Sequence, residues 1–324
     1  MVESRQLAVK KLVAKRLVLL PVLLVIISLG IFALAAVSPL DPLVGYLQER
    51  YQFVSETQRE VLAKALNLDQ PWWQAWGQWW QGVFSGDLGY SRTYRVAVSQ
   101  VLTQRLPATL ILSATSLVVA FLMAIVLGLA ATRFPRLGKV IRSLTVVIQA
   151  TPPFAVALGA VLVLALQWGW FPAGGRAATA SSDYLDLNHL IAPTFVLALT
   201  QLPWLLLTLL DATQTALRSE FTWRSQQRGI PSWRILTRQI IPLSLAPTVT
   251  MLGMRLPELI VGAVLVEEVF SWGGIAQALV GAARTLDLPL LAILTLGSAA
   301  LVILGSLLAD ICYLFLDPRV RFDD

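Results

Sequence analysis

The chain has 324 residues, of which 56% are hydrophobic and only 14% are charged. Soluble domains average roughly 45–50% apolar and 25% charged residues, so this composition excludes an ordinary soluble domain and predicts a membrane protein. The net charge of +6 does not indicate a nucleic-acid partner, because the basic residues gather in short segments between apolar ones.

Six apolar segments are long enough to cross a bilayer, which takes about 20 helical residues. They cover residues 17–37, 107–131, 142–166, 189–210, 246–266 and 289–315. We therefore expect an all-α integral membrane protein with six transmembrane helices. Its parts are an N-terminal tail with the first helix (1–37), an extracytoplasmic helical segment (38–106), and a five-helix core (107–324) that contains a cytoplasmic loop over 211–245.

The first apolar run follows a basic N-terminus, as in a secretory signal. Because this run is about 20 residues long, where a signal has 7–15, we expect an uncleaved helix. The prolines of Ser38-Pro39-Leu40-Asp41-Pro42 should end it.

The extracytoplasmic segment is too long to be a plain loop, since connections longer than about 12–15 residues usually carry structure or function. Ser55 and Gln58 predict the start of a helix there. Four tryptophans that follow share one helical face, and they are Trp72, Trp76, Trp79 and Trp80. Tryptophan favours the membrane–water boundary, so we expect an interfacial anchor. A cage for a cationic ligand is the alternative, but the run holds no acidic residue. The turn over 86–91 should return the chain to the membrane.

Basic residues define the expected orientation. Five lie in residues 1–16, four in 132–142, five in 211–245 and two in the C-terminal tail, whereas the loops over 167–188 and 267–288 hold one each. The positive-inside rule then places both termini in the cytoplasm.

The segment Glu220–Pro242 is a structured loop on the basic side. It predicts two short helices that lie along the membrane surface and join at Gly229, a residue that can adopt positive φ. Its apolar residues are Trp223, Ile230, Trp233, Ile235 and Leu236. We expect them to fill a groove on a partner protein while the arginines fix the register. The alternative is a solvated basic loop held near anionic membrane lipid.

The fifth span carries two charges, Arg255 and Glu258, on one helix face. A charge at the bilayer centre costs on the order of 2.5–3.5 kcal/mol on insertion scales, so both should face the bundle interior or water. They are candidates to line a translocation path and to select solute polarity. A structural pair or a contact with another subunit is the alternative.

Catalytic chemistry is not indicated. The single histidine, His189, lies at the edge of the fourth span, and the single cysteine, Cys312, lies inside the sixth. The sequence has no HExxH, G-x-S-x-G or G-x-x-x-x-G-K-[ST] motif. We expect no catalytic residue, metal site or cofactor in this chain, so an ion gradient or a separate subunit must supply energy.

Six stretches stand in order along nearly the whole chain: SPLDP (38–42), LNLDQPW (66–72), GDLGYS (86–91), RLPATL (105–110), GAVLVEEVFSWGG (262–274) and DPRVR (317–321). Together they resemble the permease subunits of bacterial ABC importers of the dipeptide/oligopeptide/nickel class. Such permeases share a cytoplasmic loop of the form EAA-x3-G, nine residues, then I-x-L-P. Gly229 and Pro242 keep that spacing, while Trp223-Arg224-Ser225 replaces EAA and Gln239 replaces the isoleucine. The peptide branch of this family has a looser version of the loop, of the form A-R-A-K-G. In this chain only the basic residue and the glycine of that version are present, as Arg228 and Gly229.

The resemblance implies a subunit of the bacterial inner membrane that works with a second permease, two cytoplasmic ATPases that bind ATP-Mg, and an external solute-binding protein. The coupling loop would then include Trp223, Arg224, Ser225, Arg228, Gly229, Ile230 and Pro242. Glu267 matches an acidic position at the outer end of the fifth span, where it would line the path, meet the binding protein or lie among lipid headgroups. Peptides are the expected solutes, with nickel or metal chelates as the alternative.

Two other classes of protein stay open. An ion-coupled secondary transporter would often show an inverted repeat with broken helices, which this sequence does not show. A membrane scaffold would carry no solute. Loss of ATPase subunits on disruption of Gly229 would favour the importer.

Overall fold

A computed structural model describes residues 2–66, 68, 70–175 and 186–316 of the chain. Within these ranges, the side chains of residues 2–9, 11, 12, 45, 48, 256–261, 309 and 312–316 lie outside the described part. The predictions for Glu258 and Cys312 concern side chains that lie outside the described part. Residue Arg176 lies outside the described residues entirely.

The N-terminal helix α1 (Val2–Ala36) ends just before Ser38-Pro39, as expected. In the segment predicted to be extracytoplasmic, the described residues form four short helices. These are α2 (Leu43–Leu47), the 3₁₀-helix η1 (Gln48–Phe53), α3 (Glu56–Ala65) and α4 (Trp72–Phe84). The cap at Ser55 is confirmed, because its hydroxyl accepts from the N–H of Gln58 while the Gln58 side chain accepts from the N–H of Ser55.

A two-stranded antiparallel hairpin, β1 (Tyr90–Ser91) and β2 (Val96–Ala97), follows the turn. Asp287, just before the last helix, fixes this hairpin: its carboxylate accepts from the Ser91 hydroxyl at 2.6 Å and from the N–H of Thr93 at 3.0 Å. Helix α5 (Val98–Arg133) begins directly after β2. The second long helix therefore starts earlier than residue 107, and the segment predicted to be extracytoplasmic is correspondingly shorter.

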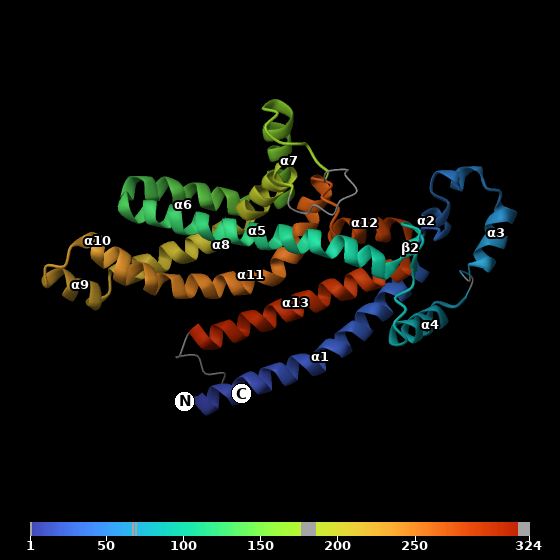
Figure 1. The fold of residues 1–324 in the computed structure, drawn as a ribbon, viewed down its shortest axis with the longest axis horizontal. Helices are drawn as coiled ribbons and strands as arrows, with labels where there is room; N and C mark the ends of the chain where they lie inside the picture. The colour runs from blue at the N-terminus through green and yellow to red at the C-terminus, as the bar shows by residue number, and fades with distance from the viewer. Residues whose placement is uncertain (1, 67, 69, 176–185, 317–324) are drawn as a thin grey trace.

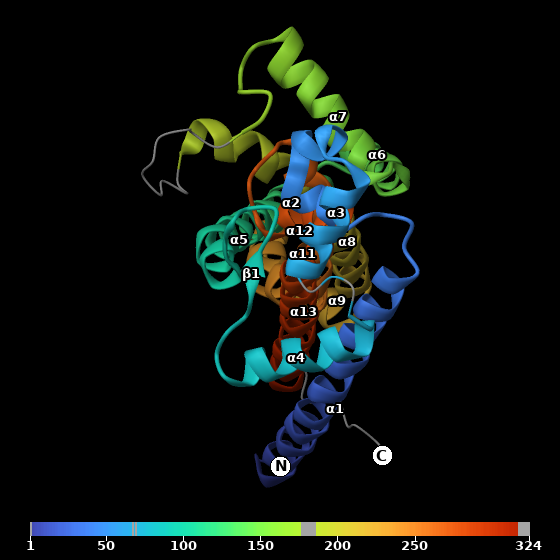
Figure 2. The ribbon, with the colours of Figure 1, turned by 90° about the vertical axis from the view of Figure 1, so that its right-hand side faces the viewer.

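The third expected span, 142–166, is broken. Helix α6 (Pro135–Ala150) is followed by α7 (Pro153–Ala160) and the π-helix η2 (Val161–Gln167), and the two halves are bent by 105°. Pro152 and Pro153 supply no N–H groups, and Pro152 forces Thr151 into the extended conformation. Figures 1 and 2 show α7 and η2 leading away from the bundle.

The remaining elements are α8 (Leu187–Leu217), α9 (Glu220–Gln227), α10 (Ser232–Ile235), the π-helix η3 (Leu236–Ile240), α11 (Ile241–Val269), α12 (Ile275–Thr285) and α13 (Leu288–Leu316). Helix α12 was not expected, since residues 267–288 were predicted as a loop. It packs against α13, α11 and α5.

Small residues bring α5 and α8 together. Ala120, Ala124 and Gly128 recur at every fourth position of α5 and are buried. A Cβ on Gly128 would lie 2.6 Å from Cδ2 of Leu209 in α8, so only glycine fits this crossing without rearrangement. Such stripes let helix backbones approach closely inside membranes, where packing replaces the hydrophobic effect as the driving force. Helix α8 also contacts α11, which packs on α13, and α13 packs on α1.

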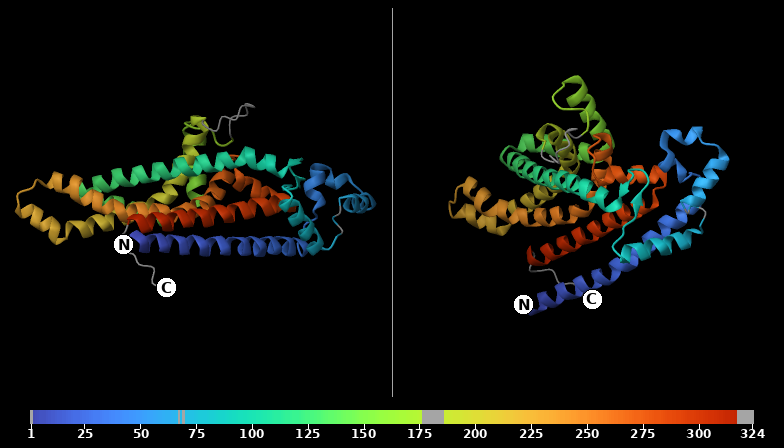
Figure 3. Two further views of the ribbon diagram at one scale, coloured as in Figure 1. Left: turned by 60° about the horizontal axis from the view of Figure 1, so that its bottom comes forward. Right: turned by 45° about the vertical axis from the view of Figure 1, so that its right-hand side comes forward.

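Among the described residues, five helices are long and apolar enough to cross a membrane: Val13–Ala36, Val98–Arg133, Leu187–Leu217, Ser232–Arg255 and Leu288–Leu308. The bent pair makes a sixth if it counts as one span. The expected all-α membrane fold is confirmed, with five candidate membrane-spanning helices among the described residues and a bent pair as the sixth. The N-terminal end of α1 lies toward the end of the bundle that carries α9 and α10, and α2–α4 lie at the opposite end (Figures 1 and 3).

Candidate functional site

Helix α9 is anchored to the end of α8 by hydroxyl groups. Ser219 caps it, accepting from the N–H of Thr222 at 3.4 Å. The Thr222 hydroxyl donates to the carbonyl oxygen of Ala216 in α8 at 2.7 Å. Glu220 and Arg224 form an ion pair at 3.0 Å on the exposed face. The Thr222 contact is buried and the Ser219 contact is partly buried, and together they hold α9 on α8, whereas exposed ion pairs contribute little.

Gly229 closes α9 in a Schellman motif. Its φ is +72°, which confirms the positive φ foreseen for this residue. The N–H of Gly229 donates to Gln226 at 2.9 Å, and the N–H of Ile230 donates to Ser225 at 3.3 Å. This 5→2 and 6→1 pair satisfies carbonyl groups that the last helical turn leaves free. The glycine therefore sets the angle at which the chain leaves α9.

The second half of the loop differs from the expectation. Helix α10 is not a separate helix, because it continues through η3 into α11. Residues Ser232–Arg255 form one helix that is long and apolar enough to cross a membrane. Pro242 lacks the N–H that would continue the α-helical ladder, and the π-turn of η3 precedes it. The helix thus passes the proline without ending. With α8 reaching Leu217, the expected loop over 211–245 shrinks to the stretch from 218 to 231, and the fifth span begins well before residue 246.

The five apolar residues predicted to meet a partner divide into two groups. Ile235 is 2% exposed and packs with Ala216, Ile240, Ile230 and Leu236 in a small core. Trp223 and Trp233 are 59% and 61% exposed, and Phe221 of α9, which the sequence had not singled out, is 59% exposed. These three aromatic residues thus offer the most apolar surface to a partner, while the isoleucines and the leucine pack together in the small core.

A groove of about 830 Å³ lies beside the exposed Trp233. Its walls come from the end of α5, including Leu129 and Arg133, and from α9, α10 and η3, including Gln226 and Trp233. The guanidinium of Arg234 lies 5.4 Å from the Trp233 ring centroid. We define the α9–Gly229 element as residues 219–235. It combines exposed aromatic rings, arginines and a fixed backbone, which suits docking to another protein.

Arg255 is 9% exposed and lies in the middle of α11. Its guanidinium carbon is 3.8 Å from the ring centroid of Trp204 in α8, a distance at which the aromatic face stabilises a cation. The sequence had not singled out Trp204, because the two residues belong to different helices and no local spacing relates them. Glu258 lies one turn farther along α11, outside the described side chains.

Glu267 is fully buried. Its carboxylate accepts from the Thr109 hydroxyl of α5 at 2.5 Å and from the N–H groups of Ala276 and Gln277 at 3.0 and 3.3 Å. The Thr109 oxygen in turn accepts from the N–H of Ile275 at 2.9 Å. Glu267 and Thr109 thus cap the first turn of α12, where a negative charge meets the positive end of the helix dipole. This geometry gives Glu267 a structural role and leaves it no exposed surface. The predicted contact of Glu267 with a solute, a binding protein or lipid headgroups stays a prediction, and the burial of Glu267 does not favour it.

Apolar packing and a shared hydrogen-bond acceptor, Ser28, join α4 to α1. The indole N–H groups of Trp76 and Trp80 donate to the Ser28 hydroxyl at 3.0 and 3.1 Å, and this hydroxyl donates to the carbonyl of Val25 at 2.8 Å. Ser28 has no exposed surface. The tryptophan helix therefore packs on α1, a contact that the tryptophan spacing alone did not reveal.

His189 contacts the N-cap of α8, Asp186, at 2.7 Å. This hydrogen bond is the main cause of the lowered pKa of Asp186. Among the described residues, no group of three His, Cys, Asp or Glu side chains could hold a metal ion.

Comparison with known proteins gives a consistent result. Residues 123–322 match a family model described as "binding-protein-dependent transport system inner membrane component". The chain is 29% identical over 316 residues to the oligopeptide transport system permease protein AppB of Bacillus subtilis (strain 168), covering 96% of this chain and 99% of that protein. It is 30% identical over 292 residues to the probable D,D-dipeptide transport system permease protein DdpB of Escherichia coli (strain K12), covering 81% and 84%. A putative peptide transport system permease protein of Brucella abortus (strain 2308) is 29% identical, with coverages of 94% and 96%. The family match includes the α9–Gly229 element.

Proposed function

This chain belongs to the family of binding-protein-dependent transport system inner membrane components, and we propose that it is the permease subunit of an ATP-driven importer whose solutes are peptides. The family match supports the class of function. The peptide assignment rests on the names of the relatives, three of which are permease proteins of oligopeptide, D,D-dipeptide and peptide transport systems. The chain is a multi-pass membrane protein in this proposal, with both termini in the cytoplasm.

We assign the α9–Gly229 element to the contact with the ATPases. Its exposed tryptophans offer apolar area, and its arginines offer hydrogen-bond donors for a complementary surface. The element lies at the end of the bundle opposite the extracytoplasmic segment (Figure 1). The complete importer would add a second permease subunit, two cytoplasmic ATPases carrying ATP-Mg, and an external solute-binding protein.

Two connections would carry movement from this element into the membrane. On one side, the Thr222 hydroxyl ties α9 to the last turn of α8. On the other side, α10 runs without interruption through η3 into α11. Helices α8 and α11 also pack against each other. A displacement of the α9–Gly229 element would therefore tilt these two helices together, and such rocking is the basis of alternating access.

Arg255 and Trp204 lie on the two helices that would move. We propose that Arg255, with Glu258 one turn away, lines the translocation path and favours solutes with a complementary charge. The stacking on Trp204 supports this role, because the aromatic face stabilises the guanidinium cation where little water reaches it.

Uptake of a labelled tripeptide into vesicles that contain the whole importer tests the proposal. Uptake should require ATP-Mg on the cytoplasmic side and should persist when ionophores collapse the proton and sodium gradients. Uptake that continues without nucleotide and stops with the ionophores would identify an ion-coupled transporter instead.

A further inference from the structure

A cavity of about 550 Å³ lies between the extracytoplasmic segment and the bundle. One wall is the last turn of α1, with Phe32, Ala35 and Ala36, and another is the start of α13, with Leu288 and Pro289. Because two candidate spans end and begin at these residues, the cavity lies at the outer edge of the apolar bundle. Lipid headgroups meet acyl chains at this level.

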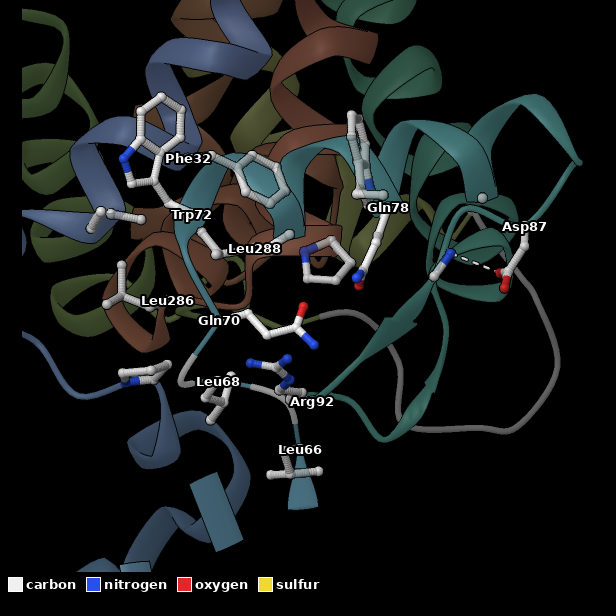
Figure 4. Close-up of a pocket in the computed structure, with 18 residues that line it drawn as sticks. Phe32, Leu66, Leu68, Gln70, Trp72, Gln78, Asp87, Arg92, Leu286 and Leu288 are labelled. Atoms are coloured by element: carbon white, nitrogen blue, oxygen red, sulfur yellow. Dashed lines mark hydrogen bonds between the residues drawn. The ribbon is translucent and has the colours of Figure 1, made fainter. Parts of the chain in front are cut away.

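The cavity has an apolar half and a polar half. Phe32, Trp72 and Leu288 supply apolar surface. Figure 4 shows the side chains of Gln70, Gln78 and Arg92 reaching into the same space. Ligand pockets typically occupy about 300–1,000 Å³ and combine apolar walls with a few polar groups that orient the ligand. The cavity fits this description.

Arg92 is the only cation among the described residues that line the cavity. Its Nη1 atom is buried and has no hydrogen-bond partner within the described part of the chain. Burial lowers the pKa of the Arg92 guanidinium, and the nearby charge of Asp287 opposes that shift. Arginine remains protonated in proteins, so a charged donor is held in a partly dry site. An anionic ligand would relieve this cost.

Two acidic side chains are the candidate partners of Arg92 within the chain. Asp287 accepts from Ser91 and Thr93 through its Oδ2 atom, whereas its buried Oδ1 atom has no hydrogen-bond partner in the described part of the chain, and Asp287 is not among the residues that line the cavity. The carboxylate of Asp87, the one acidic group among the described lining residues, accepts from the N–H of Gly89 at 2.8 Å. Figure 4 shows Asp87 apart from Arg92.

We propose that this cavity binds one anionic phospholipid of the outer leaflet. The lipid phosphate would meet the guanidinium of Arg92 and the amide groups of Gln70 and Gln78. The upper part of an acyl chain would lie along Phe32, Ala35 and Leu288. Such a lipid would join α4 and the hairpin to α1 and α13, and it would do so whether or not the chain transports peptides.

Lipid retention by the purified full-length chain tests this site. The chain is exchanged into detergent with equal amounts of phosphatidylglycerol and phosphatidylcholine, and bound lipid is counted by native mass spectrometry. We expect one tightly held phosphatidylglycerol per chain. Arg92→Gln should weaken its retention about tenfold or more, because the charge-assisted hydrogen bonds from a guanidinium to a phosphate are stronger than those from a neutral amide.

Two further variants make the test specific. Ala35→Trp fills the apolar half while leaving Arg92 intact, so it should also release the lipid, and it decides the question if Arg92→Gln does not fold. Lys64→Gln removes an exposed positive charge from α3 in the same segment and should retain the lipid as the natural chain does.

Three results would overturn the proposal. One is equal retention of phosphatidylglycerol by Arg92→Gln or Ala35→Trp. Another is retention of phosphatidylcholine as strong as that of phosphatidylglycerol. The third is displacement of the bound lipid by millimolar inorganic phosphate, which would show a simple anion site. Transport assays play no part in these readouts, so failure of the lipid site and failure of the transport function are distinguishable.

Discussion

The backbone N–H of Ile230 donates to the carbonyl oxygen of Ser225 at 3.3 Å, and this bond closes α9 across Gly229. The direction in which the chain leaves α9 therefore depends on one residue with positive φ. Because the segment after Gly229 continues into α11, this direction also sets how the exposed tryptophans stand relative to a membrane-crossing helix.

Gly229→Ala should disturb this geometry through backbone strain alone. A Cβ at this position would meet nothing within 4 Å, but a left-handed conformation costs a residue with a Cβ roughly 1–2 kcal/mol. We expect a several-fold loss of peptide uptake per ATP hydrolysed by the importer. Gly229→Asn is the matched control, since asparagine tolerates this conformation, and it should keep most of the coupling. Equal losses in both variants would show that the φ angle is not the cause.

Trp223→Ala should reduce binding of the ATPases without harming the fold. The ring is 59% exposed in this chain, so its removal creates no cavity, while an aromatic anchor at an interface is typically worth about 2 kcal/mol or more. Co-purification of the ATPases with the tagged chain measures this. Phe84→Ala, at an 83% exposed ring on α4, should leave co-purification unchanged. ATPases retained fully by Trp223→Ala would remove this residue from the contact.

Glu267→Ala should lower the apparent melting temperature of the detergent-purified chain. The change leaves the Thr109 hydroxyl and the first amides of α12 without their acceptor, and losing hydrogen bonds to a charged group costs about 1.5–3 kcal/mol. Glu268→Ala is the control, because its pairing with Arg284 at 3.4 Å is largely exposed and such pairs are worth at most about 1 kcal/mol. Similar melting temperatures for the two variants would contradict a capping role for Glu267.

Ser28→Ala should loosen α4 from α1. The indole N–H groups of Trp76 and Trp80, which are partly buried, lose their shared acceptor, and a donor left unsatisfied in a buried site costs about 1–3 kcal/mol. We expect a lower melting temperature and a red shift of tryptophan fluorescence. Ser85→Ala, just beyond the end of α4, removes an exposed hydroxyl that donates to Gly82 and should change neither. An unshifted spectrum in Ser28→Ala would show that the two hydrogen bonds do not hold the tryptophan helix.

Arg255→Gln should change which peptides are taken up. If the guanidinium attracts negatively charged groups, uptake of acidic tripeptides should fall several-fold relative to neutral ones, with normal assembly of the importer. Met254→Leu, at a neighbouring exposed position, should leave the ratio unchanged. An unaltered ratio in a fully assembled Arg255→Gln importer would exclude a role in selectivity.

Local sequence patterns predicted those elements whose cause is itself local. Ser55 and Gln58 form their reciprocal cap, the tryptophans share a helix, and Gly229 adopts positive φ. Each depends on residues a few positions apart, which a sequence displays directly.

Features that depend on contacts between distant elements were not predictable in this way. Helix α12 owes its start to Glu267 and Thr109, which come from two other helices. The stacking of Arg255 on Trp204 likewise joins α11 to α8. The break at Pro152 and Pro153 was visible in the sequence, but the apolar residues around it suggested one continuous span.

Solute flux through the purified polypeptide measures the central proposal most directly. The chain is reconstituted alone in vesicles, and in parallel with its permease partner, ATPases and binding protein, and uptake of a labelled tripeptide is followed with and without ATP-Mg. We predict uptake only in the complete assembly with nucleotide, and loss of coupling there with Gly229→Ala but not with Gly229→Asn. Full-rate uptake by the isolated chain without nucleotide would contradict this prediction.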